Sequence, residues 1–287
     1  MIGTPKKTFE ILKKHGFTFK KSLGQNFLID ANILSRIVDG AGIDNEVGVI
    51  EIGPGIGSLT EALAKKAKKV ISFEIDGRLL PILADTLADY QNVEIINNDI
   101  LKVDVDKIIA EKMADCKKIM VVANLPYYIT TPILTHLIEN TEKINGYVVM
   151  MQKEVANRLN AKVGTKDYNS LTILLNYYTN VEYLFTVPKK VFVPAPNVES
   201  AVVKIMTKTE RDFEVDGEQF FKFVRSCFVQ RRKTLLNNLI SSYGKDKKNN
   251  FVENCEKLGI ETNRRSETLT LAEFNNLYNE FKNNNLI

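Results

Sequence analysis

The chain has 287 residues, a formal net charge of +4 and 44% hydrophobic residues, which is enough for one large and one smaller domain with ordinary cores. It has no apolar run long enough to cross a bilayer, and its Lys-rich start lacks the apolar stretch of a signal peptide, so we expect a soluble cytoplasmic protein without a membrane partner. Three scattered cysteines and only two histidines argue against a disulfide framework, a zinc site or a Ser-His-Asp triad, so any chemistry should run without a metal ion or a covalent nucleophile.

Basic residues gather in two stretches of the chain. Residues 1–21 contain six lysines against a single acid, Glu10, and residues 222–233 contain no acid at all. A stretch of this kind can be a solvated face without further function, or a surface that follows the phosphates of a nucleic acid. The mild overall charge does not decide between these two interpretations.

Short apolar runs alternate with helical patterns over the first half of the chain. A helix is predicted over residues 32–40, closed by Gly40. Strands are predicted at residues 47–52, 69–75, 93–96, 119–123 and 147–151, with helices between them, as at residues 58–68 and 78–88. This alternation predicts an α/β fold with a doubly wound parallel sheet that is covered on both faces. Later in the chain, a helix at residues 170–178 precedes residues 181–187 and 198–206, which are predicted to close the sheet as an antiparallel pair.

The C-terminal part of the chain has a different character. The polar, acidic stretch at residues 208–217 marks a domain boundary, which divides the chain into residues 1–207 and a small all-helical domain at residues 208–287. Helices are predicted in this domain at residues 218–241, 251–258 and 271–282. The last of these opens with a capping box formed by Thr270 and Glu273.

A glycine-rich loop, Glu51-Ile-Gly-Pro-Gly-Ile-Gly57, stands where the first strand of the sheet meets the next helix. Glycines at this place let the backbone approach a ligand closely. In dinucleotide sites such a loop holds a pyrophosphate at a helix N-terminus, but here Glu51 precedes the first glycine and Pro54 interrupts the spacing. An acid at this position suits a ligand with a positively charged amino group. S-adenosylmethionine, with its ammonium and sulfonium charges, is such a ligand.

Two further acids follow the next two strands. Glu74 ends the second strand, 21 residues after Gly53, and this spacing suits a carboxylate that accepts both ribose hydroxyls. Asp99 follows the third strand and is placed to accept from an adenine amine. Each acid by itself can equally be a helix N-cap or an exposed loop carboxylate. Together they lie at the carboxyl ends of neighbouring parallel strands, where open α/β sheets bind ligands.

The fourth strand ends in the tetrapeptide Asn124-Leu-Pro-Tyr127. The side-chain oxygen of Asn124 and a backbone carbonyl beside Pro126 can accept the two hydrogens of an exocyclic base amine and so localise its lone pair. Tyr127 can then stack on the base with the face of its ring. Because Pro after a strand is also common in turns, a simple turn remains an open interpretation of this motif by itself.

Several motifs stand in a fixed order along residues 20–205: Lys21-Ser-Leu-Gly-Gln-Asn-Phe-Leu28, the glycine-rich loop, Phe73-Glu-Ile-Asp76, Asn98-Asp99, Asn124-Leu-Pro-Tyr-Tyr128, Gln152-Lys-Glu-Val-Ala156 and Val191-Phe-Val-Pro-Ala-Pro-Asn-Val-Glu-Ser200. By these motifs the chain resembles the ribosomal RNA adenine N6-dimethyltransferase family, whose members modify small-subunit rRNA. The helical tail also looks similar to that of the family. The chain departs from the family's pattern at Phe73, where smaller apolar residues are usual, and at Asn98, where Gly is frequent.

The resemblance implies that residues 1–207 form a Rossmann-like class I methyltransferase domain that uses S-adenosylmethionine, and that residues 208–287 form a helical RNA-binding domain. Asn26 and Leu28 would close over this cofactor from the N-terminal side, and Gly53 would lie at its methionine end. Glu74 would hold the ribose and Asp99 the adenine.

The resemblance also implies how the target base is held. Asn124 would lie between the cofactor and the base, and the rings of Tyr127 and Phe192 would enclose the base from both sides. From the residues alone, Phe192 can also be a core aromatic between prolines. The implied reaction is in-line transfer of a sulfonium methyl to adenine N6, which requires alignment and exclusion of water. The target base must be flipped or already lie in a loop, because a stacked base cannot be reached.

The implied substrate is the 3′-terminal hairpin loop of small-subunit rRNA, in which a monomeric enzyme would dimethylate adjacent adenosines. Basic side chains from the N-terminal segment and from the predicted helix at residues 218–241 would follow the phosphates. These candidate contacts are Lys20, Lys21, Arg225, Arg231, Arg232 and Lys233.

Three other functions fit part of the sequence. A large-subunit rRNA methyltransferase that confers antibiotic resistance shares the fold, but residues 124–132 and 152–156 look more like the small-subunit enzymes. A non-catalytic ribosome-assembly factor with this fold would not need the intact acids and Asn124. A NAD-dependent oxidoreductase would need a different loop, because Glu51-x-Gly-Pro-Gly is unsuited to a pyrophosphate.

Overall fold

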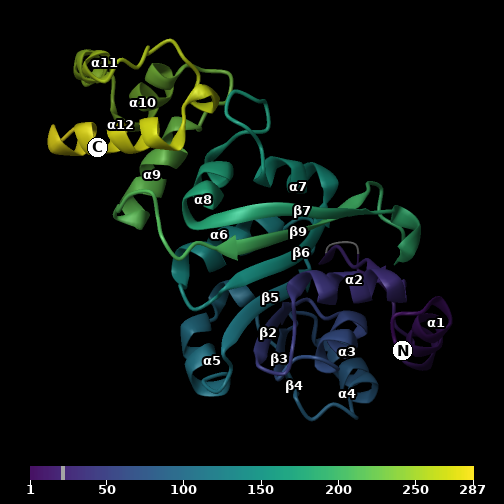
Figure 1. Cartoon of the computed structure of the whole chain (residues 1–287). Coiled ribbons are helices and arrows are strands. Elements are labelled where there is room, and N and C mark those ends of the chain that lie inside the picture. Colours follow the sequence, from purple (N-terminus) through teal and green to yellow (C-terminus); the bar gives the residue numbers. More distant parts are fainter. Residues whose placement is uncertain (21–22) are drawn as a thin grey trace. The chain divides into compact units, whose positions relative to one another are not determined.

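The computed structural model describes residues 1–20 and 23–287, which form two compact units (Figure 1). The first unit comprises Met1–Ala156 and Val181–Thr207, and the second comprises Asn157–Asn180 and Lys208–Ile287. The chain therefore passes between the units three times. The sequence marks only the last passage, because the first two fall inside a helix and a strand rather than in a polar stretch. The assignment of separate functions to residues 1–207 and 208–287 stays a prediction.

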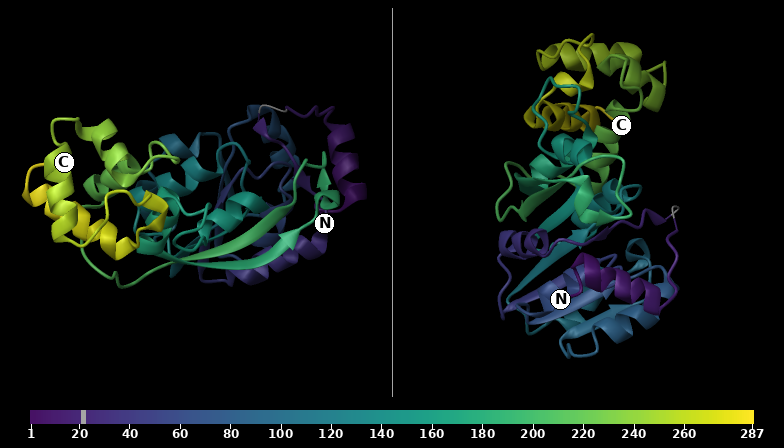
Figure 2. Two further views of the ribbon diagram at one scale, coloured as in Figure 1. Left: turned by 90° about the horizontal axis from the view of Figure 1, so that it is seen from above. Right: turned by 90° about the vertical axis from the view of Figure 1, so that its right-hand side faces the viewer.

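A twisted seven-stranded sheet forms the centre of the first unit (Figures 1 and 2). In spatial order its strands are β4 (Val93–Ile96), β3 (Lys69–Phe73), β2 (Val47–Ile52), β5 (Lys118–Asn124), β6 (Gly146–Gln152), β9 (Ser200–Thr207) and β7 (Thr179–Val187). The strands from β4 to β6 run parallel, and β9 joins β6 in the antiparallel direction. The predicted α/β fold with a parallel sheet is confirmed.

The strand order reverses between β2 and β5, because later strands are added beyond β2 on one side and beyond β5 on the other. A reversal of this kind opens a crevice outside the carboxyl ends of the two strands, where open α/β sheets bind ligands. Every residue of β2 is buried, as expected for a strand that is covered on both faces. Glu51 and Asn124 lie at the carboxyl ends of β2 and β5.

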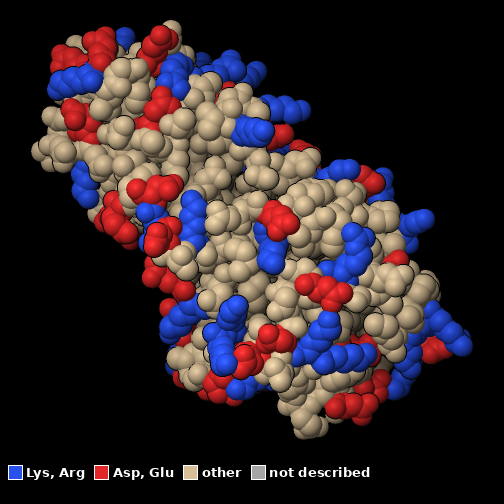
Figure 3. Space-filling model, viewed as in Figure 1, with Lys and Arg blue, Asp and Glu red and all other residues tan. Residues whose placement is uncertain are grey.

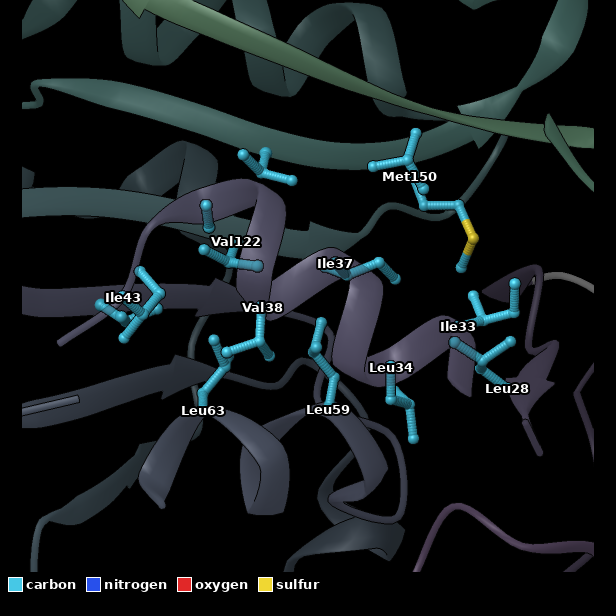
Figure 4. Packing of buried hydrophobic residues seen from close by; sticks show 14 of the residues in the cluster. Leu28, Ile33, Leu34, Ile37, Val38, Ile43, Leu59, Leu63, Val122 and Met150 are labelled. Carbon is cyan, nitrogen blue, oxygen red and sulfur yellow. The ribbon is translucent and has the colours of Figure 1, made fainter. Parts of the chain in front are cut away.

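Helices connect the strands and build the core of this unit. They are α1 (Pro5–Lys14), α2 (Ala31–Ala41), α3 (Ser58–Ala64), α4 (Leu80–Thr86), α5 (Val105–Lys112), α6 (Thr130–Asn140) and α7 (Lys153–Leu159), with short 3-10 turns η2 (Gly77–Leu79), η3 (Ile100–Lys102) and η4 (Lys189–Val191). Helix α2 contacts α3, β5 and β6. Figure 4 shows the apolar side chains of α2, among them Leu34 and Ile37, packed between Leu59 of α3 and Met150 of β6.

The predicted end of helix α2, at Gly40, is wrong. Helix α2 continues to Ala41 and ends at Gly42, which has a φ of 62° in the left-handed region that favours glycine. Gly40 lies inside the helix, where a Cβ atom would come within 2.8 Å of Leu184 Cδ1. Gly40 therefore lies at a close approach to β7 rather than at the end of the helix, and the sequence pattern does not distinguish the two positions of glycine.

A short antiparallel ladder lies outside the main sheet. β1 (Phe27–Leu28) pairs with β8 (Phe192–Val193), and Leu28 stands opposite Phe192. The Ile29 N–H also donates to the Val191 carbonyl at 2.8 Å. This ladder holds the segment that follows Asn26 in place.

The second unit is all helical. It contains α8 (Ser170–Tyr178), α9 (Gly217–Cys227), α10 (Leu235–Tyr243), α11 (Lys248–Lys257), the turn η5 (Ser266–Thr268) and α12 (Leu271–Asn283). Its core is rich in fully buried aromatic side chains, namely Tyr177, Phe220, Phe223, Phe251, Phe274 and Phe281. Helix α8 packs against α9 and α12, which explains why residues 157–180 belong to this unit. None of the helices in the described part of the chain is both long and apolar enough to cross a membrane.

The single helix predicted over residues 218–241 is wrong. The structure has two helices there, α9 and α10, joined by turns at residues 228–234. The Thr234 side chain accepts the Asn237 N–H at 3.3 Å and so starts α10 as its N-cap. Because such a side-chain bond competes with a continuous helix, apolar periodicity alone misses the break. The predicted capping box at the start of α12 is confirmed.

Candidate active site

A cavity lies in the first unit at the carboxyl ends of β2, β3, β4 and β5. Residues from distant parts of the sequence line it, including most of those predicted to hold a cofactor or a base: Asn26, Leu28, Gly53, Glu74, Asp99, Asn124, Pro126 and Tyr127. The sheet order explains this convergence, because the ends of neighbouring parallel strands meet at one edge.

The glycine-rich loop after β2 forms one wall of the cavity. Gly53 and Gly55 have φ angles of 70° and 61°, in the left-handed region that side chains rarely adopt. A Cβ atom on Gly55 would lie 2.9 Å from Cε1 of the buried Phe27 ring. A Cβ atom on Gly53 would be 4.0 Å from the ring of Pro126. The loop therefore approaches both β1 and the Asn124–Tyr127 motif without side chains in between.

Two buried carboxylates line this cavity. Glu51 is 1% exposed and accepts a hydrogen bond from Ser72 Oγ at 2.7 Å, and burial raises its pKa to about 7. Glu74 is 5% exposed and accepts the Asp76 N–H at 2.8 Å, and burial raises its pKa to about 6. Within the residues that the structure describes, neither carboxylate forms an ion pair. Buried carboxylates without a cation favour a positively charged ligand.

Replacing Glu51 by glutamine should change how folding stability depends on pH. A carboxyl whose pKa is raised from 4.5 to about 7 on folding favours the folded state below pH 4.5, and this contribution is lost as the pH rises through 7. The wild type should therefore lose stability relative to Glu51→Gln as the pH rises. We expect the difference in unfolding free energy between the two proteins to change by about 2 to 3 kcal/mol from pH 5 to pH 8, in favour of the variant. Urea unfolding of both proteins at the two pH values measures this change. A difference that is independent of pH would contradict the burial of this carboxylate.

Asp76 joins the end of β3 to the segment before β1. Its carboxylate accepts hydrogen bonds from the Arg78 guanidinium at 2.6 Å and from Gln25 Nε2 at 2.8 Å, and these bonds lower its pKa to about 2. Its N–H is the donor to Glu74, so one residue orients both walls of the cavity. Sequence reasoning misses this link, because no spacing rule joins Gln25 to a residue 51 positions away.

Asp99 is half-buried at the cavity and is also an N-cap. Its Oδ1 accepts the Leu101 N–H at 3.1 Å at the start of η3, so the N-cap interpretation that the sequence leaves open is correct. Its Oδ2 accepts no hydrogen bond from the described residues. The cap is therefore compatible with a ligand contact, because each function uses a different oxygen.

Asn124 ends β5 with its side-chain amide held in one orientation. Its Nδ2 donates to the main-chain oxygen of Asn26 at 3.1 Å, and Asn26 Nδ2 donates in turn to the Gly24 carbonyl at 3.1 Å. Because the nitrogen is used in this bond, the Asn124 Oδ1 is left as a hydrogen-bond acceptor beside the cavity.

The residues after Asn124 form a turn into α6, so the turn interpretation of this motif is also correct. The Pro126 carbonyl accepts the Ile129 N–H at 3.2 Å and the Thr130 Oγ1 at 3.0 Å. Tyr127 is half-buried, and its hydroxyl forms a hydrogen bond of 2.6 Å with Ser200 Oγ of β9. Burial raises the pKa of Tyr127, so its hydroxyl stays neutral near pH 7.

Phe192 does not line the cavity. It is 3% exposed and packs in the hydrophobic core of the first unit, opposite Leu28 in the short ladder. This is the core position that the sequence leaves open as the alternative for Phe192. In this conformation its ring cannot stack on a base.

The candidate RNA-binding residues occupy several places. Lys20 is exposed in the first unit, and Lys21 lies outside the described residues. Arg225 is exposed on α9, and the basic turn, which we define as Arg231, Arg232 and Lys233, is exposed between α9 and α10 rather than inside a helix. On the face shown in Figure 3, basic and acidic side chains are interspersed. Charge alone therefore does not mark an RNA-binding surface on this face.

A comparison with protein families identifies the family of the chain. The family model described as "Ribosomal RNA adenine dimethylase" matches residues 16–283. The chain belongs to this family. Two curated relatives in the dimethylase family are named "Ribosomal RNA small subunit methyltransferase A". The one from Geobacillus thermodenitrificans is 58% identical and covers 97% of this chain and 96% of the relative. The one from Staphylococcus carnosus is 57% identical and covers 98% of this chain and 96% of the relative.

Solved structures support the same assignment to the dimethylase family. A dimethyladenosine transferase from Plasmodium falciparum is 29% identical, with a TM-score of 0.74 over 90% of this chain and 98% of that chain. The 23S rRNA methyltransferase ErmE is 25% identical, with a TM-score of 0.62 over 90% of this chain and 100% of that chain. The resemblance indicated by the sequence motifs and the class I methyltransferase fold are therefore confirmed.

Proposed function

We propose that the chain dimethylates N6 of adjacent adenosines in the 3′-terminal hairpin loop of small-subunit rRNA, with S-adenosylmethionine as the methyl donor. The observation that carries this proposal is the oriented amide of Asn124, whose Oδ1 is free to accept beside a cavity lined by carboxylates. Relatives that are 57–58% identical over nearly the whole chain carry a small-subunit name, which supports the choice of subunit.

The residues of the cavity fit the proposed cofactor. Glu51 and Glu74 are buried carboxylates without a described cation, which suits a ligand with ammonium and sulfonium charges. Glu74 would accept from the ribose hydroxyls, and the Oδ2 of Asp99 would accept from the adenine amine. Asn26 and Leu28 would border the cofactor on the N-terminal side, with Gly53 at the methionine end. When bound, the cofactor supplies an electrophilic methyl group on a sulfonium.

The Asn124–Tyr127 motif would hold the target base. Asn124 Oδ1 and the carbonyl beside Pro126 would accept the two N6 hydrogens, which localises the nitrogen lone pair for attack. The bond to Ser200 fixes the ring of Tyr127, so the ring can present one face for stacking. Phe192 would act as the second stacking ring only after leaving its core position, and this role stays a prediction. No general base is required, because a methylated amine is acidic enough to release its proton to solvent.

Methylation of isolated ribosomal subunits tests the proposed function. The protein is incubated with labelled methyl donor and unmethylated small or large subunits, and the modified bases are mapped. We expect dimethyladenosine in the small subunit alone. Label confined to the large subunit would favour the antibiotic-resistance function, and binding to the small subunit without any label would favour a non-catalytic assembly factor. Either result would overturn the proposal.

Removing charge from the basic turn should weaken RNA binding more than methyl transfer itself. We expect the double variant Arg231→Ala/Arg232→Ala to raise the KM for subunits. A plot of the logarithm of the binding constant against the logarithm of the salt concentration should become shallower by about one unit of slope for each lost phosphate contact. The matched control is Lys107→Ala/Lys118→Ala, which removes two exposed lysines of the first unit that do not line the cavity. An unchanged salt slope in the arginine variant would show that the basic turn is a solvated surface.

A further inference from the structure

We propose that Tyr128 is a cofactor-positioning residue whose ring covers the adenosine half of the methyl donor. This inference rests on the proposed function, because it takes S-adenosylmethionine as the occupant of the cavity. It concerns the residue that follows the Asn124–Tyr127 motif, for which the proposed mechanism has no use.

Tyr128 is an exposed aromatic residue at the cavity. Its side chain is 57% exposed although it lines the cavity, and Ile75, two residues after β3, is 55% exposed and lines the same cavity. Most large apolar residues of this chain are buried, so two exposed ones at one opening need a cause. Apolar surface that borders a cavity and faces water is typical of a ligand-binding site.

The surroundings of Tyr128 place its ring on the adenosine side of the cavity. The ring lines the same cavity as Asp99 and Glu74, and burial, followed by the charges of these two carboxylates, raises the pKa of its hydroxyl. These are the two groups proposed to hold the adenine and the ribose. A Cβ atom on Gly24 would be 3.4 Å from Tyr128 Cδ1, so the ring lies close to the segment that leads to Asn26.

Tyr127 and Tyr128 are adjacent but are held differently. The Tyr127 hydroxyl is bound to Ser200, which ties that ring to β9. The Tyr128 hydroxyl has no hydrogen-bond partner among residues 1–20 and 23–287. An aromatic ring that is 57% exposed at a cavity, with its hydroxyl unbound by the described residues, can stack on the flat face of adenine. In this proposal the two tyrosines contact different molecules: Tyr127 stacks on the target base, and Tyr128 stacks on the adenine of the cofactor.

Calorimetric binding of two ligands tests this assignment. S-adenosylhomocysteine and 5′-methylthioadenosine share the adenosine half, and only the first has the amino-acid half. Loss of a stacked ring should raise the Kd of Tyr128→Ala roughly 5- to 100-fold, by the same factor for both ligands. Tyr128→Phe should bind both like the wild type, because it keeps the ring. Tyr183→Ala, which removes an exposed tyrosine of β7 away from the cavity, is the matched control and should bind normally.

Kinetics give a second readout that a general loss of structure would not imitate. In Tyr128→Ala the KM for the methyl donor should rise while kcat at saturating donor stays unchanged, because the ring lies on the half that does not react. Unchanged affinity for both ligands, with a raised KM for RNA instead, would place the ring on the substrate and overturn the proposal. Weaker binding of S-adenosylhomocysteine alone would place it on the methionine half and overturn it as well. Wild-type protein that binds neither ligand would overturn the proposed function itself.

Discussion

Replacing Asn124 by alanine should lower kcat for adenine methylation by roughly 100- to 1000-fold, the scale expected when one preorganised hydrogen bond at a reacting centre is lost. The hydrogen bond from Asn124 Nδ2 to the Asn26 carbonyl fixes the orientation of the side-chain amide. In the wild type the Oδ1 therefore does not have to reorient when the base binds. Single-turnover methylation of unmethylated small subunits measures this step. The Kd for S-adenosylhomocysteine should change much less, because Glu74 and Asp99 stay in place.

Asn145→Ala is the matched control for this variant. Asn145 uses its Oδ1 to accept the Ile119 N–H at 2.8 Å, near the start of β5 and at the opposite end of the strand from Asn124. Its loss should cost about 1 kcal/mol of unfolding free energy without slowing methylation. Methylation at the wild-type rate by Asn124→Ala would contradict the role proposed for this motif.

The residues at the strand ends can be predicted because their signals are local. Glu51, Glu74, Asp99 and Asn124 each end or follow an apolar run, and the alternation of runs and helices predicts that parallel strands place these ends together. The structure brings all four to one cavity. The purely structural interpretations of these residues are correct as well, since Asp99 is the N-cap of η3 and Pro126 begins the turn into α6.

Features that depend on distant packing cannot be predicted in this way. Gly40 lies where a Cβ atom would approach Leu184, and Phe192 is buried in the core cluster of the first unit. The link from Gln25 to Asp76 joins segments that no pattern connects. In each case the deciding neighbour is far away in the sequence, so periodicity and spacing contain no information about it.

Replacing Gly55 by alanine should destabilise the protein and weaken cofactor binding together. Two costs add at this position: a left-handed φ of 61°, which costs about 1 to 2 kcal/mol for a residue with a side chain, and overlap with the Phe27 ring, which costs about 1 to 3 kcal/mol more. We therefore expect a loss of about 2 to 5 kcal/mol in unfolding free energy, measured by urea denaturation. The Kd for S-adenosylhomocysteine should rise in the same variant, because the displaced loop forms a wall of the cavity.

Gly42→Ala separates the two costs of the Gly55 substitution. Gly42 has nearly the same φ, 62°, but nothing lies within 4 Å of a Cβ atom there, so its substitution should show the backbone cost alone. The excess loss in Gly55→Ala then measures the contact with Phe27, and Phe27→Leu combined with Gly55→Ala should recover part of that excess. Equal losses at Gly42 and Gly55 would mean that Phe27 moves aside without cost. In that case the glycine of this loop would serve backbone conformation alone, and close packing against β1 would not explain it.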